Sequence, residues 1–400
     1  MLTRRAFLVA GVSGVIGSAC GLRYGTGKSS PSLGTQKSED DTAHLQLLLD
    51  QGGTISLERG RIYRVSGQPG AKAALFIGSD TFLDLAGATL ELAPNQRCPM
   101  ITLRPGRISN VRIANGTIVG NGARQPTDLR PNGISELAST LHLIGCDGLE
   151  LRNLTMRDTY MYAAYVVGND GIVDNVDIMN AIGGGIHING AGWSIDKVRV
   201  RNVSHFEPVY TTGNPFIVAL RNSEIGSIYC ENYGFGVKFQ NGCENVTVGS
   251  IEAVGGSNNN DYLVKIQGTN SPGKNRPNRN IKIGRIISRN GPLSGLYIYH
   301  STDVEIGSYH GEANGRSDNA LNIQNGADIL IIDSDQIHFG ELKAIDYPRH
   351  ALWLHRAGLV TAERVVMESR ISRENSPVVI RDGRAVLAGV EHVGPKGLTK

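Results

Sequence analysis

The chain has 400 residues, with 51 glycines, 19% charged residues and only 6% aromatic residues. This composition predicts an interior built from aliphatic side chains rather than rings. The formal net charge of +3 is too small to indicate a nucleic-acid partner, and we expect none.

Residues 1–20 predict a targeting segment. Thr3–Leu8 contains paired arginines and is followed by an apolar run, a pattern that resembles the twin-arginine export motif. Gly17–Cys20 resembles a lipoprotein cleavage box with Cys20 as the lipidated residue. Glycine stands where such boxes usually have leucine, so ordinary cleavage near Ala19 stays open. A transmembrane anchor is disfavoured because the run is short and glycine-rich. We therefore expect an exported protein, either periplasmic and free, lipid-anchored through Cys20, or secreted.

Residues 21–37 are rich in Gly, Ser and Pro and predict a flexible linker. Residues 38–400 are predicted to form one domain. It begins with a short helix that starts at Ser38–Asp41, ends at Gly52–Gly53 and carries an apolar stripe of Leu45, Leu48 and Leu49. We expect this helix to cap the N-terminal end of a repeat array, whose apolar interior would otherwise meet water.

The rest of the chain repeats one pattern, a short alternating strand followed by a Gly, Asn or Asp turn. It is clearest in Val237–Gln240 and returns in Leu263–Gly268 with Lys and Gln at equivalent positions. Alternation at period two places the aliphatic residues on one face and the intervening residues on the other. The aligned strands are Leu75–Ile77, Ile101–Arg104, Leu141–Ile144, Ala164–Val167, Ile186–Asn189, Val218–Arg221, Val237–Gln240, Leu263–Gly268, Leu296–Tyr299, Leu321–Gln324, Leu352–His355 and Val378–Arg381.

Strands this far apart in sequence are not hairpins, and a unit that recurs with variable loops indicates a solenoid. The predicted fold is all-β: a single-stranded right-handed parallel β-helix with a short N-terminal capping helix. A propeller would need about four strands per blade and a steadier period. A Rossmann-type sheet would need helices between the strands, and no long helical periodicity follows residue 50.

The head of the domain adds a resemblance. Asp41–Gln46, Gly52–Leu57 and Gly60–Val65 together look like the start of the pectate-lyase-like β-helix superfamily. With the strand repeats, the resemblance covers roughly residues 38–390 and implies the same fold. It does not choose a reaction, because members include lyases, hydrolases, epimerases and phage tail enzymes.

In a β-helix the outward side chains of one sheet form rows, with neighbouring coils about 4.8 Å apart. The second strand positions carry His142, Tyr165, His187, Ala219, Lys238, Lys265, Tyr297, Asn322 and Trp353. The fourth positions carry Ile144, Val167, Asn189, Arg221, Gln240, Gln267, Tyr299, Gln324 and His355. Neither row contains Asp or Glu, which favours an extended acidic polysaccharide as the partner.

Uronic-acid polymers suit this charge, and β-elimination suits these residue types. The reaction requires neutralisation of the C6 carboxylate, removal of the C5 proton and protonation of the departing O4 oxygen. Adjacent lysines would also lower the pKa of at least one of them. The predicted catalytic residues are Lys238, Lys265, His187, Tyr165 and Tyr297. The predicted substrate-binding residues are Arg221 as a carboxylate clamp, His142, Asn189, Gln240, Gln267, Tyr299, Asn322, Trp353 and His355.

Each assignment has a simpler structural alternative. The stacked lysines would also serve merely to keep the sheet face soluble. His142 and His355 lie near the ends of the rows, where surface or subsite roles are favoured over catalysis. Tyr297, Tyr299 and Trp353 would either stack on sugars or cover apolar surface.

Two loops flank the rows. His205–Tyr210 would wall one side, and Asn270–Asn280, with Lys274, Arg276 and Arg279, is either a second basic wall or a charged loop. We expect a monomer.

No cofactor is predicted. Asn258–Asp261 offers one acid among amides, which is a weak calcium motif. The remaining cysteines form no metal motif, and we expect them to be small buried residues. They are Cys98, Cys146, Cys230 and Cys243, of which Cys146 and Cys243 fall too many coils apart for a disulfide.

Among reactions, lyase ranks first, C5-epimerase second and hydrolase third. Tyr233–Lys238 stands where a polygalacturonase-like hydrolase would show paired aspartates, and hydrolysis needs such carboxylates. A mannuronan-type epimerase begins with the same proton abstraction. Its Asp-Pro-His-Asp signature is missing here, and Tyr233–Phe235 matches the epimerase pattern only in part. From a different class, a non-catalytic exported protein that binds an exopolysaccharide would use the same rows.

Overall fold

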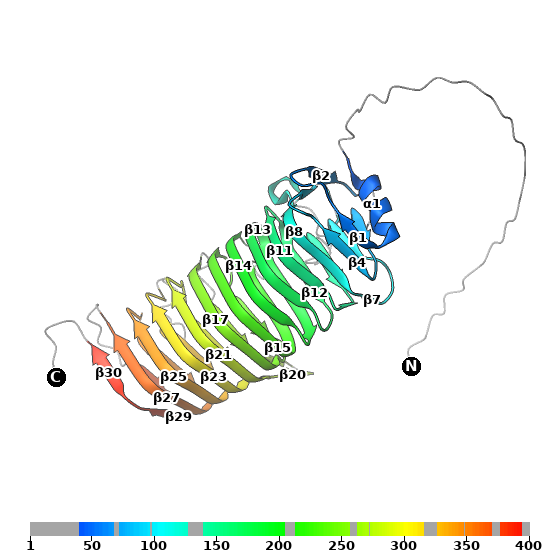
Figure 1. Ribbon diagram of the computed structural model, residues 1–400. Helices are drawn as coiled ribbons and strands as arrows, with labels where there is room; N and C mark the ends of the chain where they lie inside the picture. The colour runs from blue at the N-terminus through cyan, green and yellow to red at the C-terminus, as the bar shows by residue number, and fades with distance from the viewer. Residues whose placement is uncertain are drawn as a thin grey trace, which may run out of the picture. The chain divides into compact units, whose positions relative to one another are not determined.

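The structure is a computed structural model that describes residues 40–67, 72–96, 98–126, 139–204, 213–256, 262–271, 273–315, 326–347, 349–369 and 377–393. Within these ranges the chain winds into a β-solenoid of about 11 turns with one short helix at its N-terminal end (Figure 1). The predicted parallel β-helix with its capping helix is therefore confirmed. The predicted targeting segment, residues 1–20, and the linker, residues 21–37, lie outside the described residues.

The helix α1 covers Thr42–Gln51, and a 3-10 turn covers Gly122–Arg124. The strands are β1 (Gly53–Ser56), β2 (Ile62–Val65), β3 (Leu75–Ile77), β4 (Thr81–Asp84), β5 (Thr89–Leu92), β6 (Ile101–Leu103), β7 (Ile108–Ser109), β8 (Val111–Val119), β9 (Leu141–Ile144), β10 (Cys146–Asp147), β11 (Glu150–Arg157), β12 (Tyr160–Val167), β13 (Ile172–Ala191), β14 (Ser194–Ser204), β15 (Asn214–Tyr233), β16 (Val237–Gln240), β17 (Glu244–Gly256), β18 (Val264–Gln267), β19 (Thr269–Ser271), β20 (Lys274–Arg276), β21 (Asn278–Arg289), β22 (Leu296–Tyr299), β23 (Ser301–Glu312), β24 (Ala327–Ile332), β25 (Asp335–Ile345), β26 (His350–His355), β27 (Ala357–Glu368), β28 (Val378–Ile380), β29 (Gly383–Leu387) and β30 (Val390–Val393).

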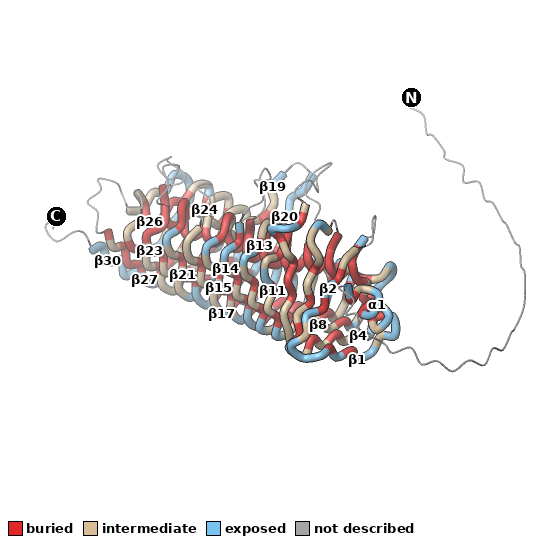
Figure 2. Tube along the Cα trace, turned by 90° about the horizontal axis from the view of Figure 1, so that it is seen from above, coloured by how far each residue is buried: buried red, intermediate tan, exposed pale blue. Residues whose placement is uncertain are grey.

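Each strand pairs in parallel with the equivalent strand of the next coil. One such ladder runs β3, β6, β9, β12, the end of β13, the start of β15, then β16, β18, β22, β24, β26 and β28. We call it the site ladder, because it carries the predicted rows. The hairpin β19–β20 is the only antiparallel pair among the described strands, and in Figure 2 it stands out from the body as an exposed segment.

The interior is a continuous column of apolar and mostly aliphatic side chains. Alternation places Val237 and Phe239 inward, and both are 0% exposed, as is Ile266 on the next coil. Burial of each such side chain contributes about 1.5–3 kcal/mol. Leu45 and Leu49 of α1 join the same cluster at 2% exposure, so the helix covers the N-terminal end of the column as predicted.

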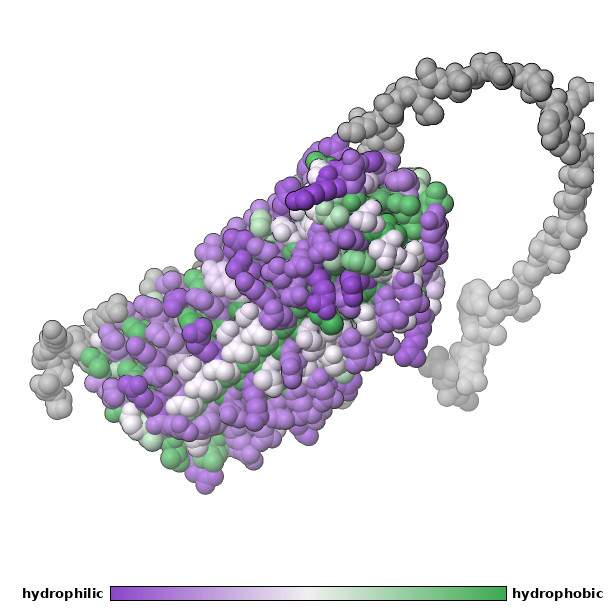
Figure 3. Space-filling model, viewed as in Figure 1, coloured by the Kyte–Doolittle hydropathy of each residue, from purple (hydrophilic) through white to green (hydrophobic). Residues whose placement is uncertain are grey.

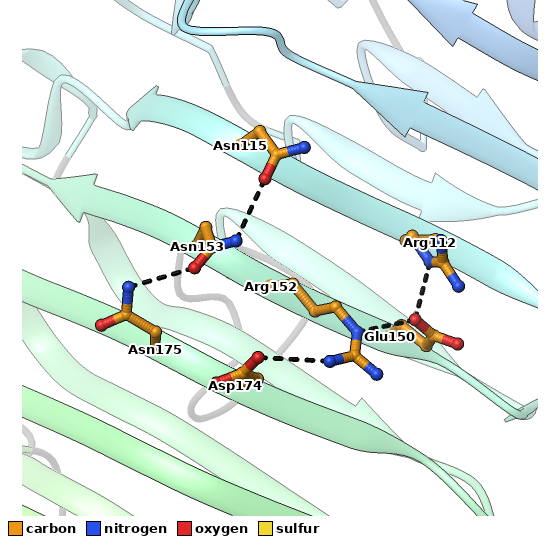
Figure 4. Close-up of polar contacts among 7 residues, drawn as sticks. All are labelled: Arg112, Asn115, Glu150, Arg152, Asn153, Asp174 and Asn175. Carbon is orange, nitrogen blue, oxygen red and sulfur yellow. Dashed lines mark hydrogen bonds and ion pairs between the residues drawn. The ribbon is translucent and has the colours of Figure 1, made fainter.

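Asparagines fix many of the turns between sheets. Asn115, Asn153 and Asn175 have left-handed φ angles of 61°, 48° and 50°, a conformation that asparagine tolerates better than most residues. Their amides form a ladder along the stack: Nδ2 of Asn153 donates to Oδ1 of Asn115 at 3.2 Å, and Nδ2 of Asn175 donates to Asn153 at 3.1 Å (Figure 4). The stacked amides hold successive coils in one register.

Glycines form a second ladder. The five residues at this bend share the same contact, in which an added Cβ would lie 2.5–2.6 Å from the carbonyl oxygen of the preceding coil. They are Gly226, Gly249, Gly284, Gly307 and Gly340. Only glycine permits coils to stack this closely at the bend.

The structure corrects the predicted alignment at two places. The coil after β22 contributes β24 to the ladder, with Leu330 in register with Tyr297, rather than the predicted Leu321–Gln324, which lies outside the described residues. In β15 the register pairs His187 with Ile217, two residues before the predicted Ala219.

The four described cysteines are buried and free, which confirms that prediction. Burial raises the pKa of their thiols, most of all for Cys230, so they stay protonated and unreactive. Among the described residues, the structure contains no helix with the length and apolar character needed to cross a membrane.

Candidate functional site

The register of the strands sets the second-position row of the site ladder. In order along the stack it consists of His142, Tyr165, His187, Ile217, Lys238, Lys265, Tyr297, Leu330, Trp353 and Val379. All five predicted catalytic residues therefore lie on one outward row. The fourth-position row includes Ile144, Val167, Asn189, Ala219, Gln240, Gln267, Tyr299, Ile332 and His355.

Three predicted residues make direct ring contacts at the N-terminal half of the row. The rings of His142 and Tyr165 stack with centroids 5.9 Å apart and an interplanar angle of 17°. The ring of His187 meets that of Tyr165 edge-on, with centroids 4.7 Å apart. Tyr162, which the sequence did not single out, closes the cluster with its ring centroid 5.7 Å from that of His187.

The next coil makes room for Tyr162 with a run of three glycines, residues 183–185. Gly184 lies in register with Tyr162, and an added Cβ there would be only 2.5 Å from the Tyr162 ring. Gly183 has a φ of 113°, which favours glycine. A glycine run opposite an aromatic residue was therefore the available sequence signal for this fourth ring.

Burial favours the neutral form of the two histidines in this cluster. The pKa of His187 is lowered to about 4, chiefly by burial and further by the positive charge of Lys238. The pKa of His142 is also lowered by burial, and its side chain is 8% exposed. Nδ1 of His187 and Nε2 of His142 have no hydrogen-bond partner within the described structure. His187 is consequently a neutral imidazole at pH values well below the usual range for histidine.

The lysines occupy the middle of the row. Lys238 and Lys265 are in register on adjacent coils, and Tyr297 follows on the next coil. Nζ of Lys265 lies 5.6 Å from the ring centroid of Tyr262, which in turn stacks on Tyr297 at 4.5 Å. Ile217, buried to 4% exposure, separates the lysines from His187 by one coil.

Tyr297 stays in its neutral, protonated form. Its pKa is raised above that of ordinary tyrosine, first by burial and then by Tyr262, Tyr299 and Asp333 nearby. The stacked rings of Tyr262, Tyr297 and Tyr299 form a continuous aromatic patch, with the last two centroids 6.0 Å apart. Tyr262 was not among the predicted residues.

Two surface cavities lie beside the fourth-position row, one on each side of the base of the hairpin β19–β20. The first, of about 680 Å³, is lined by Asn189, Arg221, Arg276 and Arg279 among others. The second, of about 710 Å³, includes Tyr299. Pro277, next to the hairpin, lines both cavities.

Two predicted binding residues, Arg221 and Asn322, are not among the described members of the rows. Arg221 is not in the fourth-position row, because β15 is shifted by two residues; it pairs instead with Ala191 and Glu244 at the turn. Asn322 lies outside the described residues, and Leu330 takes the place predicted for it.

At the C-terminal end of the row, the side chains of Trp353 and His355 are largely buried. Trp353 is 4% exposed, packs with Leu330 in a small apolar cluster and has the Arg381 guanidinium 5.1 Å from its ring centroid. His355 is partly buried, and its Nδ1 has no partner among the described residues. The proposed binding surface therefore does not include Trp353 or His355.

The charge pattern of the two rows differs from that of the other sheet faces. Neither row carries a carboxylate at any of its described positions. On the sheet formed by β8, β11 and β13, by contrast, Glu150 lies between Arg112 and Arg152 at 2.6 and 2.8 Å, and Arg152 reaches Asp174 at 3.2 Å (Figure 4). The side of the molecule seen in Figure 1 is mostly hydrophilic (Figure 3). The lack of acidic side chains at the described positions of the two rows is therefore a local feature.

The residues that the structure describes contain no group of three or more His, Cys, Asp or Glu side chains placed to hold a metal ion. The weak calcium motif Asn258–Asp261 and the predicted wall His205–Tyr210 lie outside those residues.

Comparison with protein-family models and with curated proteins gives no match. Solved structures do match. The pre-mature gene product 12 of bacteriophage phi29 has a TM-score of 0.61 and 12% identity over 91% of this chain; the chain spans 55% of that protein's length. A tailspike double mutant of the E. coli bacteriophage HK620, in complex with a pentasaccharide, has a TM-score of 0.50 and 11% identity over 89% of this chain and 77% of that one. An endo-xylogalacturonan hydrolase from Aspergillus tubingensis has a TM-score of 0.49 and 15% identity over 89% of this chain and 98% of that one.

The chain thus shares its β-solenoid fold with the two phage proteins, whose TM-scores are 0.61 and 0.50. The resemblance to the pectate-lyase-like superfamily is confirmed at the level of this fold. At such low identity the likeness shows the fold alone, because these folds carry many activities.

Proposed function

We propose that this protein is an exported enzyme that binds a uronic-acid-containing polysaccharide along the second-position row and cleaves it by β-elimination. One observation carries the proposal: Lys238 and Lys265 lie in register on adjacent coils, on the same outward row as a neutral His187 and Tyr165. The row offers cations for the carboxylate and neutral groups for proton transfer, with no acid of its own at its described positions.

In the proposed reaction, Lys238 and Lys265 neutralise the C6 carboxylate and stabilise the charge that develops on it. A neutral base removes the C5 proton, the C4=C5 double bond forms, the C4–O4 bond breaks, and an acid delivers a proton to O4. His187 acts as the base, because its low pKa keeps its imidazole neutral and able to take up a proton. Tyr165, in ring contact with His187, suits the acid.

His187 and Lys238 are two coils apart, a separation of about 10 Å along the stack. A bound sugar would therefore lie over Ile217, between the two groups. Asn189, Gln240 and Gln267 on the neighbouring row would hydrogen-bond hydroxyl groups.

A second candidate is binding without cleavage. The aromatic patch of Tyr262, Tyr297 and Tyr299 favours it, because such a surface can hold sugars by stacking without chemistry. The solved tailspike with a bound pentasaccharide is compatible with a glycan as ligand. Export and location in the periplasm, with or without a lipid on Cys20, are part of the proposal.

A panel of uronic-acid polymers separates the candidates. New ultraviolet absorbance from the C4=C5 double bond means elimination. New reducing ends without that absorbance mean hydrolysis, and a changed ratio of C5 epimers with neither means epimerisation. Binding with no chemical change would leave the non-catalytic function and refute the lyase proposal.

A further inference from the structure

The cavity of about 680 Å³ on one side of the hairpin β19–β20 is rich in arginine. Arg221, Arg276 and Arg279 line it, and one carboxylate, that of Glu244, lines it with them. Within the described residues none of the three guanidiniums forms an ion pair, including with Glu244. Arginines elsewhere on the coils do form them, as Arg112 and Arg152 show (Figure 4).

The register of the coils fixes the spacing of this cluster. Arg221, Glu244 and Arg279 occupy the same turn position on three successive coils. Arg221 and Arg279 are therefore two coils apart, a backbone separation of about 10 Å. This span is similar to the length of a disaccharide.

The backbone that carries the arginines is held by a buried asparagine. Asn278, which is 0% exposed, lies between Arg276 and Arg279 in sequence. Its Oδ1 accepts hydrogen bonds from the amides of Gly242 and Cys243 at 3.2 and 2.9 Å, and its Nδ2 donates to the Phe239 carbonyl at 3.1 Å. The base of the cavity is consequently fixed before any ligand arrives.

The hairpin itself is tied to the body at two points. Thr269 donates from Oγ1 to Oδ1 of Asn241 at 2.7 Å, and Oδ1 of Asn275 lies 2.6 Å from Nε2 of His300. These contacts hold Arg276 at the cavity wall, close to Gly242. A Cβ added at Gly242 would lie 3.4 Å from the Cβ of Arg276.

We propose that this cavity binds an oxyanion group of an acidic glycan, a carboxylate or a sulfate ester, through Arg221, Arg276 and Arg279. Guanidinium groups stay charged at all physiological pH values and bind such anions through paired hydrogen bonds. Asn189 and Asn275 on the cavity wall suit sugar hydroxyls, which favours a glycan over a nucleic acid. The inference extends the proposed function, because it adds an anion site beside the row of Lys238 and Lys265.

The test uses the full chain and measures binding without relying on turnover. Apparent Kd values are determined at low salt for polygalacturonate, dextran sulfate, neutral dextran and an oligonucleotide. The variant is the double substitution Arg276→Gln/Arg279→Gln. The matched control is Lys282→Gln/Arg285→Gln, which removes the same charge from exposed positions of β21 outside this cavity.

The expected result is a loss of about tenfold or more in affinity for polygalacturonate or dextran sulfate in the variant, since each removed group makes charge-assisted contacts. The control should stay within about twofold of the unmodified protein. A larger loss of affinity for polygalacturonate would identify the oxyanion as a carboxylate, and a larger loss for dextran sulfate would identify it as a sulfate ester. Neutral dextran should not bind.

Unchanged affinity in the variant overturns the inference, and so does an equal loss in the control. Tighter binding of the oligonucleotide than of either acidic glycan, lost in the variant, would also overturn it. Parallel turnover assays keep the two proposals separate. If the unmodified protein catalyses elimination but the variant keeps its affinity, only the arginine site is refuted. If the variant loses affinity as expected but no elimination is detected, only the lyase proposal is refuted.

Discussion

The low pKa of His187 is the quantity on which the proposed base depends. The shift from the ordinary value of 6.5 to about 4 corresponds to about 3 kcal/mol against the imidazolium. Burial is the larger cause and the charge of Lys238 the smaller. At about 10 Å, a unit charge contributes about 0.4 kcal/mol in water and about 1.7 kcal/mol at an effective dielectric constant of 20. We therefore predict that Lys238→Gln raises the pKa of His187 by about 0.3 to 1.2 but leaves it below 6.5.

The measurement is an NMR titration of the histidine ring protons from acid to neutral pH. His187→Asn assigns the resonance among the ten histidines. Low ionic strength is required, because the Debye length is then about 30 Å and the lysine charge is not screened. Lys282→Gln, which removes an exposed lysine paired with Glu305, should leave the titration unchanged. A pKa of 6.5 or above in the unmodified protein would refute the burial argument, and no response to Lys238→Gln would refute the placement of the lysine.

Three further predictions concern the stability of the coil stack. Asp328 is 1% exposed and burial raises its pKa to about 7, so the folded state holds its proton longer than the unfolded chain as pH rises from about 4 to 7. Stability should therefore fall over that range by about 4 kcal/mol relative to Asp328→Asn, in denaturant titrations at several pH values; a constant difference between the two proteins would contradict this. Phe239→Ala should lower the free energy of unfolding by about 3–5 kcal/mol, because the ring is fully buried; a loss below 1 kcal/mol would mean that the ring is not in the core. Asn153→Ala should have a free energy of unfolding about 1 kcal/mol lower than that of Asn153→Gly, since only glycine keeps the left-handed φ without strain. A higher free energy of unfolding for Asn153→Ala would exclude that conformation.

The sequence was sufficient for the fold but not for the register of every coil. Apolar alternation predicts β16, β18 and β22 closely, since their inward positions are apolar and their outward positions polar. In β15 the same alternation extends over Phe216, Val218 and Leu220. A shift of two residues preserves a period-two pattern, so periodicity alone does not distinguish Ile217 from Ala219 as the outward residue.

The error at Leu321–Gln324 has a different cause. The true strand, β24, has a buried residue on its outward face, Leu330 at 1% exposure, so its sequence does not alternate. The glycine ladder held the missing information. Gly307 and Gly340 are as far apart in sequence as Tyr297 and Leu330, and matching the glycines would have aligned the strand correctly.

The candidate site was predicted in part for the same reasons. Apart from the β15 position, the row from His142 to Tyr297 follows from strands whose pattern is unambiguous. The position of Tyr262 could not be predicted, because it precedes β18, where side-chain direction depends on how the chain bends. Tyr162 lies within β12, and the glycine run 183–185 was the sequence signal for it. The arginine cavity depends on which turns lie beside one another, and that follows only from the register of the coils.

The most direct test of the account is the rate of elimination by Lys238→Ala and Lys265→Ala on whichever acidic polymer the unmodified protein cleaves. We predict that each substitution lowers kcat/KM by about a hundredfold or more, with unchanged thermal unfolding, because each removes a cation that stabilises the transition state. Full activity in both variants would contradict the assignment of the chemistry to this row.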